Sequence, residues 1–425
     1  MSDTQSSSVA APASRADGVT APLASLRVVE CSMLGPGAIT TPLADLGADV
    51  VKVEPPQGDY VREMTWPIVD GVSLMHLQLS RGKRSVVLDL RTEAGRSVFL
   101  DLVRGADAVV EAMRPGGLAR RGLGFEQLRE VNPRIVFCTI SGYGMTGPYR
   151  DLPSHGIAYD TWAGVVTPER TPEGFPGIPE HVSIGINAGP LYGALAILAG
   201  VTNARATGEG SQLEVAQSDA AAAMDWLRSS TWRAYERPES EVTGNKSDDY
   251  ERRPPGTAGM RDGVRYQIYE SADGFVMLMA SEQAFWKSFC EGVGRSDLFE
   301  RWPGSKLADH AKGNLELRAI LAEVFAGRST QAWIDFAGQH NVPIAPVNSP
   351  KTLAEDPQFE DRMSWLPASE LGADLLPNPI KVVGQAQPTP SRAPTVGEHT
   401  DEVLTTVLGY DEARVAELRA AGALG

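Results

Sequence analysis

Short β-branched runs alternate with helical segments along the first half of the chain. Strands are expected at Leu26–Glu30, Asp49–Val53, Ser85–Leu88, Ala108–Val110 and Arg134–Thr139, with helices at Ala38–Leu46 and Glu93–Arg104 between them. This alternation is typical of a parallel sheet that carries helices on both faces. The pattern therefore predicts an α/β, Rossmann-like large domain.

The pattern changes in the middle of the chain. Leu191–Val201 is small and apolar throughout and predicts a buried helix, followed by a strand at Gln212–Val215 and a helix at Ser218–Trp226. From Leu227 to Pro255 the chain is polar and without periodicity, which is typical of a linker. We therefore expect a disordered N-terminus at 1–21, a large domain at 22–226 and a linker at 227–255.

The residues after the linker predict a second, smaller α+β domain at 256–342. Its paired strands are expected at Tyr266–Tyr269 and Gly274–Ala280, and its helices at Glu282–Gly292, Leu315–Phe325 and Thr330–His340. After Pro343 the chain becomes rich in proline and ends with a helix at Asp411–Ala421. The chain thus divides into two domains, as its 425 residues suggest.

Composition narrows the classes of function. The net charge of −15 argues against binding to nucleic acid or to an anionic membrane, because both need clustered Lys and Arg. The three widely spaced cysteines are typical of buried thiols in a reduced cytoplasm. No hydrophobic run is expected to span a bilayer, and the first 20 residues have no apolar signal-peptide core. We expect a cytoplasmic protein.

Two groups of residues suggest an anionic ligand. Gly35-Pro36-Gly37 follows the first strand and is either a tight turn or a weak dinucleotide fingerprint, which leaves a nucleotide-dependent oxidoreductase as a distant alternative. Basic residues gather at Lys83-Arg84, Arg91 and Arg120 and are either an anion site or solvated loop charges. The histidines lack ligand-like spacing, so we expect no metal site.

Several blocks of sequence carry a family resemblance. The blocks are SRGKRSVVLDLRTEAG, MRPGGLARRGLGFEQL, ISGYGMTGPYRDLPSHGIAYDTWAG and PTVGEHTDEVL, in this order along Pro22–Gly425. They resemble the family III CoA-transferases, the carnitine and bile-acid class that includes formyl-CoA transferase and α-methylacyl-CoA racemase. The resemblance implies that residues 343–425 return to the large domain and that two chains interlock as a homodimer or as a heterodimer with a paralogous subunit.

The resemblance also implies the chemistry. CoA thioesters of organic acids would be substrates, with no permanently bound cofactor, and Leu88, Arg91 and Arg120 would contact CoA together with the Lys83-Arg84 pair. In the family, an Asp carboxylate attacks the thioester and forms a mixed anhydride and then an aspartyl-CoA thioester. The position of that Asp corresponds to Ile186, so the activity of the isolated chain is open.

Two residues remain as catalytic candidates. Asp160, the nearest carboxylate, is either a substitute nucleophile or base, or a helix-terminal residue that complements the dipole. His155 matches the histidine of the racemase branch and is either a proton-transfer residue or a polar residue at a helix start. The alternatives are therefore a CoA-transferase, a catalytically silent subunit of a heteromeric CoA-transferase, and a racemase-like isomerase.

Overall fold

A computed structural model describes residues 21–64, 66–180, 182–244, 246, 250, 252, 260–305 and 310–424. Two compact units divide the chain: a large unit at Met1–Trp226 and Met363–Gly425, and a small unit at Leu227–Arg362. Residues 343–362, which we placed in the returning segment, thus group with the small unit. The N-terminal segment that we expected to be disordered lies outside the described residues, apart from residue 21.

The large unit is built on a six-stranded parallel sheet, as the alternating pattern predicted. Its strands are β1 (Arg27–Cys31), β2 (Asp49–Glu54), β5 (Arg84–Val87), β6 (Ala108–Glu111), β7 (Val136–Ser141) and β10 (Ser211–Ala216). They lie in the order β10-β7-β6-β1-β2-β5, and every pair is parallel. The order reverses between β1 and β6, which is where α/β sheets bind ligands at their carboxyl edge.

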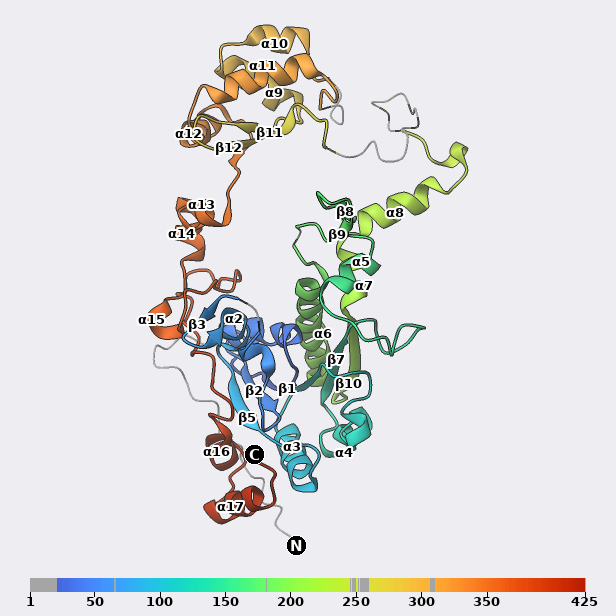
Figure 1. Cartoon of the computed structure of the whole chain (residues 1–425), viewed down its shortest axis with the longest axis vertical. Helices are drawn as coiled ribbons and strands as arrows, with labels where there is room; N and C mark the ends of the chain where they lie inside the picture. Colours follow the sequence, from blue (N-terminus) through green and yellow to red (C-terminus); the bar gives the residue numbers. More distant parts are fainter. Residues whose placement is uncertain are drawn as a thin grey trace. The chain divides into compact units, whose positions relative to one another are not determined.

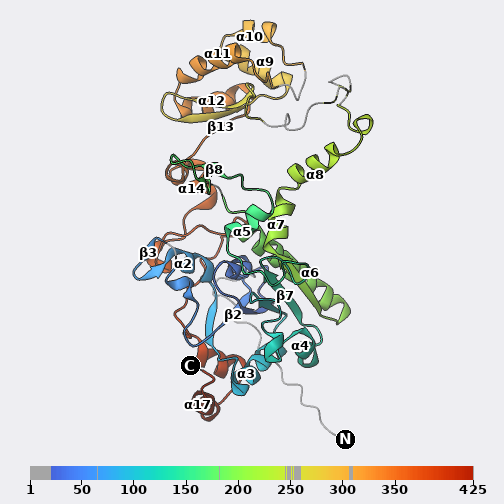
Figure 2. The ribbon, with the colours of Figure 1, turned by 45° about the vertical axis from the view of Figure 1, so that its right-hand side comes forward.

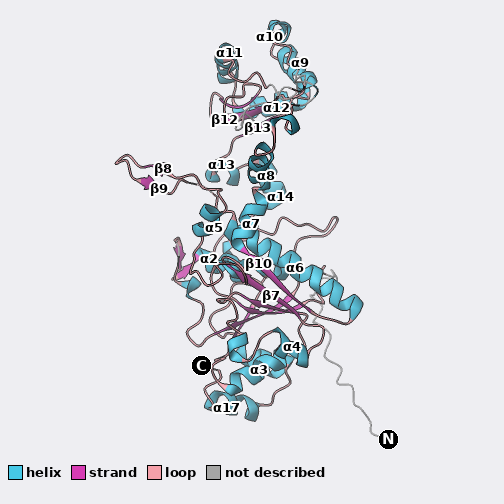
Figure 3. Ribbon diagram, turned by 90° about the vertical axis from the view of Figure 1, so that its right-hand side faces the viewer, coloured by secondary structure: helices cyan, strands magenta, loops and turns pink. Residues whose placement is uncertain are grey.

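Helices cover both faces of this sheet. The helices of the large unit are α1 (Thr41–Asp45), α2 (Leu74–Ser80), α3 (Glu93–Arg104), α4 (Phe125–Val131), α5 (Ile157–Trp162), α6 (Gly185–Thr207), α7 (Gln217–Met224), α15 (Ala368–Leu371), α16 (Thr400–Glu402) and α17 (Glu412–Ala420), not all of which contact the sheet. Figure 3 shows α6 along one face, with α3, α4 and α17 on the other. Alternate residues of each strand enter the two cores: Val28 packs on the α6 side and Val29 on the α3 side. In the C-terminal segment, Leu418 of α17 packs into the core on the α3 side of the sheet. Helix α16 lies beside β5 (Figure 1).

The buried helix predicted at Leu191–Val201 is the middle of the longer helix α6. Small residues let α6 pack closely on the sheet: a Cβ on Gly200 would lie 2.7 Å from a methyl group of Val136. Helix α6 has 23 residues, and an 18-residue stretch of it has a mean hydropathy of 1.3, so it is long and apolar enough to cross a membrane, contrary to our expectation for this chain. Half of that stretch is buried, and α6 packs on β7 and β10 as a core helix does.

Short elements connect these layers. The large unit also contains the short helical segments η1 (Gly35–Ile39), η2 (Tyr60–Arg62), η3 (Ala119–Arg121) and η6 (Val403–Val407). It has the small hairpins β3 (Ile68–Val69) with β4 (Val72–Ser73) and β8 (Glu169–Arg170) with β9 (Pro176–Gly177). Helices α5 and α7 pack on each other and on the N-terminal part of α6 (Figure 2). The helices that follow β7 and β10 in the chain, α5 and α7, therefore both pack near the start of α6.

The small unit has its own core. Three antiparallel strands, β11 (Tyr266–Glu270), β12 (Phe275–Met279) and β13 (Ile344–Pro346), pair in the order β11-β12-β13. Its other elements are α8 (Trp226–Tyr235), η4 (Glu239–Glu241), α9 (Gln283–Gly292), α10 (Ser296–Arg301), α11 (Leu315–Ala326), α12 (Thr330–His340), α13 (Pro350–Ala354) and α14 (Pro357–Met363), of which α8 and α14 each cross a unit boundary by one residue. Stacked aromatic side chains, including Trp286, Phe289 and Phe325, fill the α+β core. Most of the linker predicted at 227–255 is described, and helix α8 and the turn η4 form within it; residues 245, 247–249, 251 and 253–255 lie outside the described residues.

Candidate functional site

Asp160 holds the first turn of α6 in place. Its side chain is fully buried, and its two oxygens accept the backbone N–H groups of Ile184 (Oδ2, 3.0 Å) and Gly185 (Oδ1, 2.7 Å). These N–H groups have no partner within the helix, and a carboxylate at a helix N-terminus also complements the helix dipole. This geometry favours the structural role of Asp160, since both oxygens are already engaged.

Ile186 lies in the first turn of α6, directly after the residues that Asp160 holds. No acidic residue occurs in that turn, and the Ile186 side chain is half-buried. A Cβ on Gly156 would lie 3.9 Å from Cγ2 of Ile186, so the segment that carries His155 adjoins this turn. The start of α6 therefore brings His155 and Ile186 into one region, without a free carboxylate in the turn itself.

His155 lies in the loop just before α5. Its side chain is exposed, and within the described part of the chain its imidazole has no hydrogen-bond partner. Its backbone carbonyl accepts the N–H of Ala158 at 2.8 Å, which closes the turn into α5. The imidazole is thus accessible at the carboxyl edge, but a proton-transfer pair needs a second acid or base that the first turn of α6 does not supply.

Arg91 and Arg120 follow the carboxyl ends of two strands. Arg91 follows β5, is 75% exposed and makes a two-pronged contact with Asp89 (Nε–Oδ1 2.8 Å, Nη2–Oδ2 2.7 Å). Hydrogen bonds from Arg91 lower the pKa of Asp89 to about 2, and the charge of Arg121 acts in the same direction. The loop after β6, which carries Arg120 and Arg121, therefore lies near Asp89 at the same edge.

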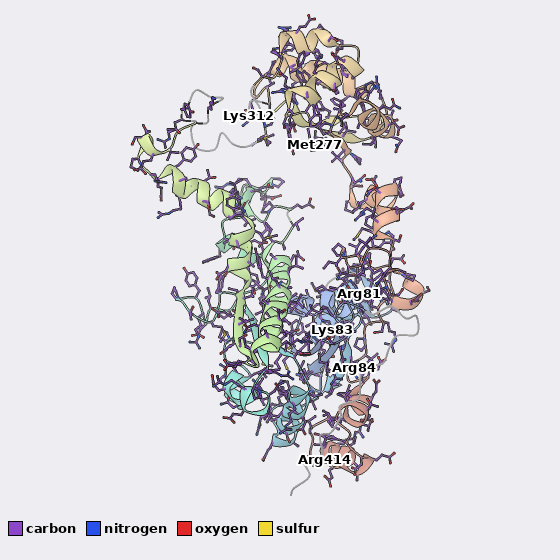
Figure 4. All side chains as sticks on the ribbon, turned by 180° about the vertical axis from the view of Figure 1, so that it is seen from behind. Arg81, Lys83, Arg84, Met277, Lys312 and Arg414 are labelled. Atoms are coloured by element: carbon purple, nitrogen blue, oxygen red, sulfur yellow. The ribbon has the colours of Figure 1, made fainter. Side chains whose placement is uncertain are left out.

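Three other predicted CoA contacts are placed differently. The side chain of Leu88 is buried in the core on the α3 side and does not line an open surface. Lys83 and Arg84, which Figure 4 labels, lie at the start of β5. Leu88 and Arg91 follow the other end of that strand. Arg84 binds Asp49 at the start of β2 (Nη2–Oδ1 2.6 Å), so its charge is already paired.

Lys83 belongs to a buried ionic cluster centred on Glu30. The Nζ of Lys83 lies 2.9 Å from Oε2 of Glu30, and the Nζ of Lys52 lies 3.0 Å from Oε1. Burial by itself raises the pKa of Glu30, but the attraction of the two lysines and hydrogen bonds from Ser32 and Thr40 outweigh it and lower the pKa to about 2. Glu30 therefore stays ionised at neutral pH.

The ionic cluster shapes the turn after β1. Lys52 donates to the carbonyl of Ser32 and Lys83 to the carbonyl of Gly37, each at 2.7 Å. Between them, Leu34 adopts a φ of 58°, a region that side-chain-bearing residues rarely occupy. The cluster thus fixes both ends of the Gly35-Pro36-Gly37 turn, which explains this motif as structure.

Glu111 is a site residue that the sequence reasoning missed. It ends β6 at the point where the strand order reverses, and it is 1% exposed. Its carboxylate accepts the N–H of Leu118 at 2.6 Å and the hydroxyl of Thr139 at 3.3 Å. The signal was available in the sequence, because an acidic residue at the end of the apolar run AVVE is unusual in a buried strand.

A hollow also exists at the opposite, amino edge of the sheet. It has a volume of about 460 Å³ and is lined by residues such as Arg27, Asp49, Gly105 and Tyr410. The last turn of α3 ends beside it, and helix C-termini repel anions. We therefore place the candidate site at the carboxyl edge. In the described ranges, no group of three or more His, Cys, Asp or Glu side chains is suited to a metal ion.

Comparison with known proteins agrees with the α/β fold described above. A succinate–glutarate CoA-transferase of Agrobacterium fabrum is 30% identical over 402 residues, which cover 90% of this chain and 95% of that protein. A succinyl-CoA–L-malate CoA-transferase beta subunit of Chloroflexus aurantiacus is 28% identical over 418 residues, covering 95% and 98%. The crystal structure of a CAIB/BAIF family protein from Brucella suis superposes with a TM-score of 0.72 at 26% identity, covering 91% and 99%.

A family model agrees with these relatives. The model for CoA-transferase family III matches residues 23–400, which is most of the chain. The match spans both units and includes the first turn of α6 and the loop after β6. The match leads to the same assignment as the structural likeness. The chain therefore belongs to CoA-transferase family III.

Proposed function

We propose that this chain acts in CoA transfer between short organic acids, with the reacting carboxylate contributed by a paralogous partner chain. The observation that carries the proposal is the first turn of α6. Ile186 occupies the position where the family resemblance places the nucleophile, and no acidic residue lies in that turn. Asp160, the nearest carboxylate, binds two backbone N–H groups and is buried.

Two relatives support the details of this proposal. The names of the Agrobacterium and Chloroflexus relatives refer to succinate, glutarate and malate, so dicarboxylic acids are the acceptors to test first. The Chloroflexus relative is named as a beta subunit, which is a precedent for a heteromeric enzyme in this family. A racemase function is less well supported, because His155 lacks the second acid or base.

CoA itself is expected to bind at the carboxyl edge. We propose Arg91 and Arg120 as contacts to its phosphates, since both follow carboxyl strand ends and Arg91 is largely exposed. Lys83 and Arg84 are left out of this site because Glu30 and Asp49 already pair with them. CoA and acyl-CoA are substrates here rather than permanently bound cofactors.

Replacing Arg91 or Arg120 with Ala should weaken CoA binding by roughly 1.5–3 kcal/mol for each charge-assisted hydrogen bond that the change removes. Calorimetry measures this affinity, and Arg129→Ala on the exposed face of α4 is the matched control. In the same preparation, the wild-type chain alone should bind CoA but transfer it only slowly from succinyl-CoA to glutarate. Fast transfer by the isolated chain would refute the need for a partner carboxylate, and unchanged affinity in both variants would remove these arginines from the site.

We also propose that the chain forms a dimer. Leu191 and Leu195 on α6 are 59% and 61% exposed, and Met224 and Trp226 at the end of α7 and the start of α8 are 56% and 61% exposed. Large apolar side chains at this exposure are typical of a surface that another chain covers. Light scattering at micromolar concentration should give the mass of a dimer, alone or with the paralogue, and a stable monomer in both conditions would contradict the proposal.

The location of the protein stays a proposal. Cys31, Cys138 and Cys290 are all buried free thiols, and burial raises the pKa of each. Buried free thiols suit the reducing cytoplasm, where we propose that this protein acts.

A further inference from the structure

The loop between β6 and α4 is tied to the sheet by Glu111. Oε1 of Glu111 accepts the N–H of Leu118 at 2.6 Å, and Oε2 accepts the hydroxyl of Thr139, which lies beside Glu111 on β7. The side chain of Leu118 is itself fully buried. One carboxylate therefore fixes the far end of this loop to the carboxyl ends of two strands.

The same loop carries Arg120, which belongs to the proposed CoA site, and hydrogen bonds within the loop hold it together. Nη1 of Arg120 donates to the carbonyl of Pro115 at 2.9 Å, and Nη1 of Arg121 donates to the carbonyl of Gly117 at 2.7 Å. A Cβ on Gly117 would lie 2.5 Å from Cβ of Met113, so the loop leaves no room for a side chain there. The loop is thus a compact unit whose place depends on how it is anchored.

An ionised carboxylate at this point costs the protein stability. Burial raises the pKa of Glu111, although the Leu118 N–H, the Thr139 hydroxyl and the charges of Arg120 and Arg121 oppose the shift. From the adjacent strand β1, the thiol of Cys31 also faces this carboxylate and stays neutral, because burial raises its pKa. A neutral glutamine has nearly the same shape: its amide oxygen can accept the Leu118 N–H and its amide NH2 can donate to the Thr139 hydroxyl, without the cost of burying a charge. The presence of glutamate here suggests a role beyond stability.

We propose that Glu111 is a positioning residue that holds the loop Ala112–Arg121 so that Arg120 faces the anionic part of CoA. This inference rests on the proposed binding of CoA at the carboxyl edge. Glu111 does not touch the ligand; it acts through the Leu118 N–H and through the attraction of its charge for the two arginines. Glu111 thereby has a function in CoA binding, although the transfer chemistry itself does not use this buried carboxylate.

Calorimetry of CoA binding to three variants tests this role. Glu111→Ala should weaken the affinity about tenfold, because the loop loses its anchor, whereas Glu111→Gln should bind CoA about threefold more weakly than wild type at pH 8. Glu126→Ala, an exposed acidic residue on α4, is the matched control and should bind as wild type does. Partial unfolding of a variant lowers the number of binding sites and not the affinity of each, so the titration separates the two effects.

The pH profile and hydrogen exchange complete the test. As the pH falls, wild-type Glu111 takes up a proton, so the affinity ratio of wild type to Glu111→Gln should move toward one. In ligand-free protein, Glu111→Ala should speed amide exchange in the peptide 112–121 more than in α4. Equal CoA affinity for wild type and Glu111→Ala would overturn the inference alone, whereas wild type that binds no CoA would overturn the proposed function and the inference with it. If Glu111→Ala does not fold, a ratio of CoA affinities between wild type and Glu111→Gln that does not change with pH would also overturn the inference.

Discussion

Replacing Glu30 with Ala should lower the free energy of unfolding by roughly 3–5 kcal/mol. The change removes the carboxylate that pairs with the buried Lys83, and it leaves Lys52 paired with Asp59 alone. Denaturant titration followed by circular dichroism measures the loss. Glu417→Ala, an exposed partner of Arg414 on α17, is the control and should change stability by less than about 1 kcal/mol.

The pH dependence of Glu30→Gln gives a second reading of the same cluster. The pKa of Glu30 is about 2 in the folded protein, below its ordinary value of 4.5, so its ionisation stabilises the fold above pH 4.5. That contribution is lost as the pH falls from 4.5 toward 2, and the stability difference between wild type and Glu30→Gln should shrink in this range. A stability difference that stays constant from about pH 7 to about pH 3 would contradict the ionised cluster.

The double variant Glu30→Ala, Lys83→Met should be more stable than Glu30→Ala alone, because it removes the unpaired charge of Lys83.

Introducing a carboxylate at Ile186 should raise the slow CoA-transfer rate that we expect of the isolated chain. Ile186 lies in the first turn of a 23-residue helix, where the dipole favours an anionic side chain. Its side chain is half-buried and adjoins the segment that carries His155. Transfer from succinyl-CoA to glutarate by Ile186→Asp should rise roughly 10²-fold, a small part of the ~10⁶-fold loss seen when a nucleophile is removed from an enzyme.

Ile186→Asn is the control for that gain. Asparagine has the size and polarity of aspartate but cannot form an anhydride with an acyl group. It should therefore leave the transfer rate at the level of the wild-type chain. An equal gain in both variants would show that the change acts through the shape of the turn and not through covalent chemistry.

Much of the fold could be predicted because its signals are local. The spacing of apolar residues predicted α3 and α12 with their observed bounds, and it placed the eight expected strands to within about two residues, whereas β3, β4, β8, β9 and β13 were not predicted. Helix α8 was not predicted, because none of its residues is buried and the helix therefore lacks an apolar periodicity. The start of α6 was placed too late because Asp160, 25 residues before Gly185, holds its first turn.

The candidate site was harder to predict because its contacts join distant parts of the sequence. Lys83 was expected to bind CoA as part of a basic run, but its side chain reaches Glu30, 53 residues away, and is buried there. Leu88 lies next to the carboxyl edge, yet its side chain faces the core. The sequence alone does not show whether a charged residue pairs with a ligand or with another buried residue, because the partner can be far away in the sequence and becomes a neighbour only in the folded chain.

The most direct test of the central claim is a search for an enzyme-bound carboxylate intermediate. Wild type and Ile186→Asp are incubated with succinyl-CoA and treated with hydroxylamine or borohydride, which trap or reduce an acylated carboxylate, and peptide mass analysis then locates the change. We expect no modified carboxylate in the wild-type chain and a modified residue 186 in the variant. A modified Asp160 in wild type would contradict the claim, since it would show that the residue holding α6 is also the nucleophile.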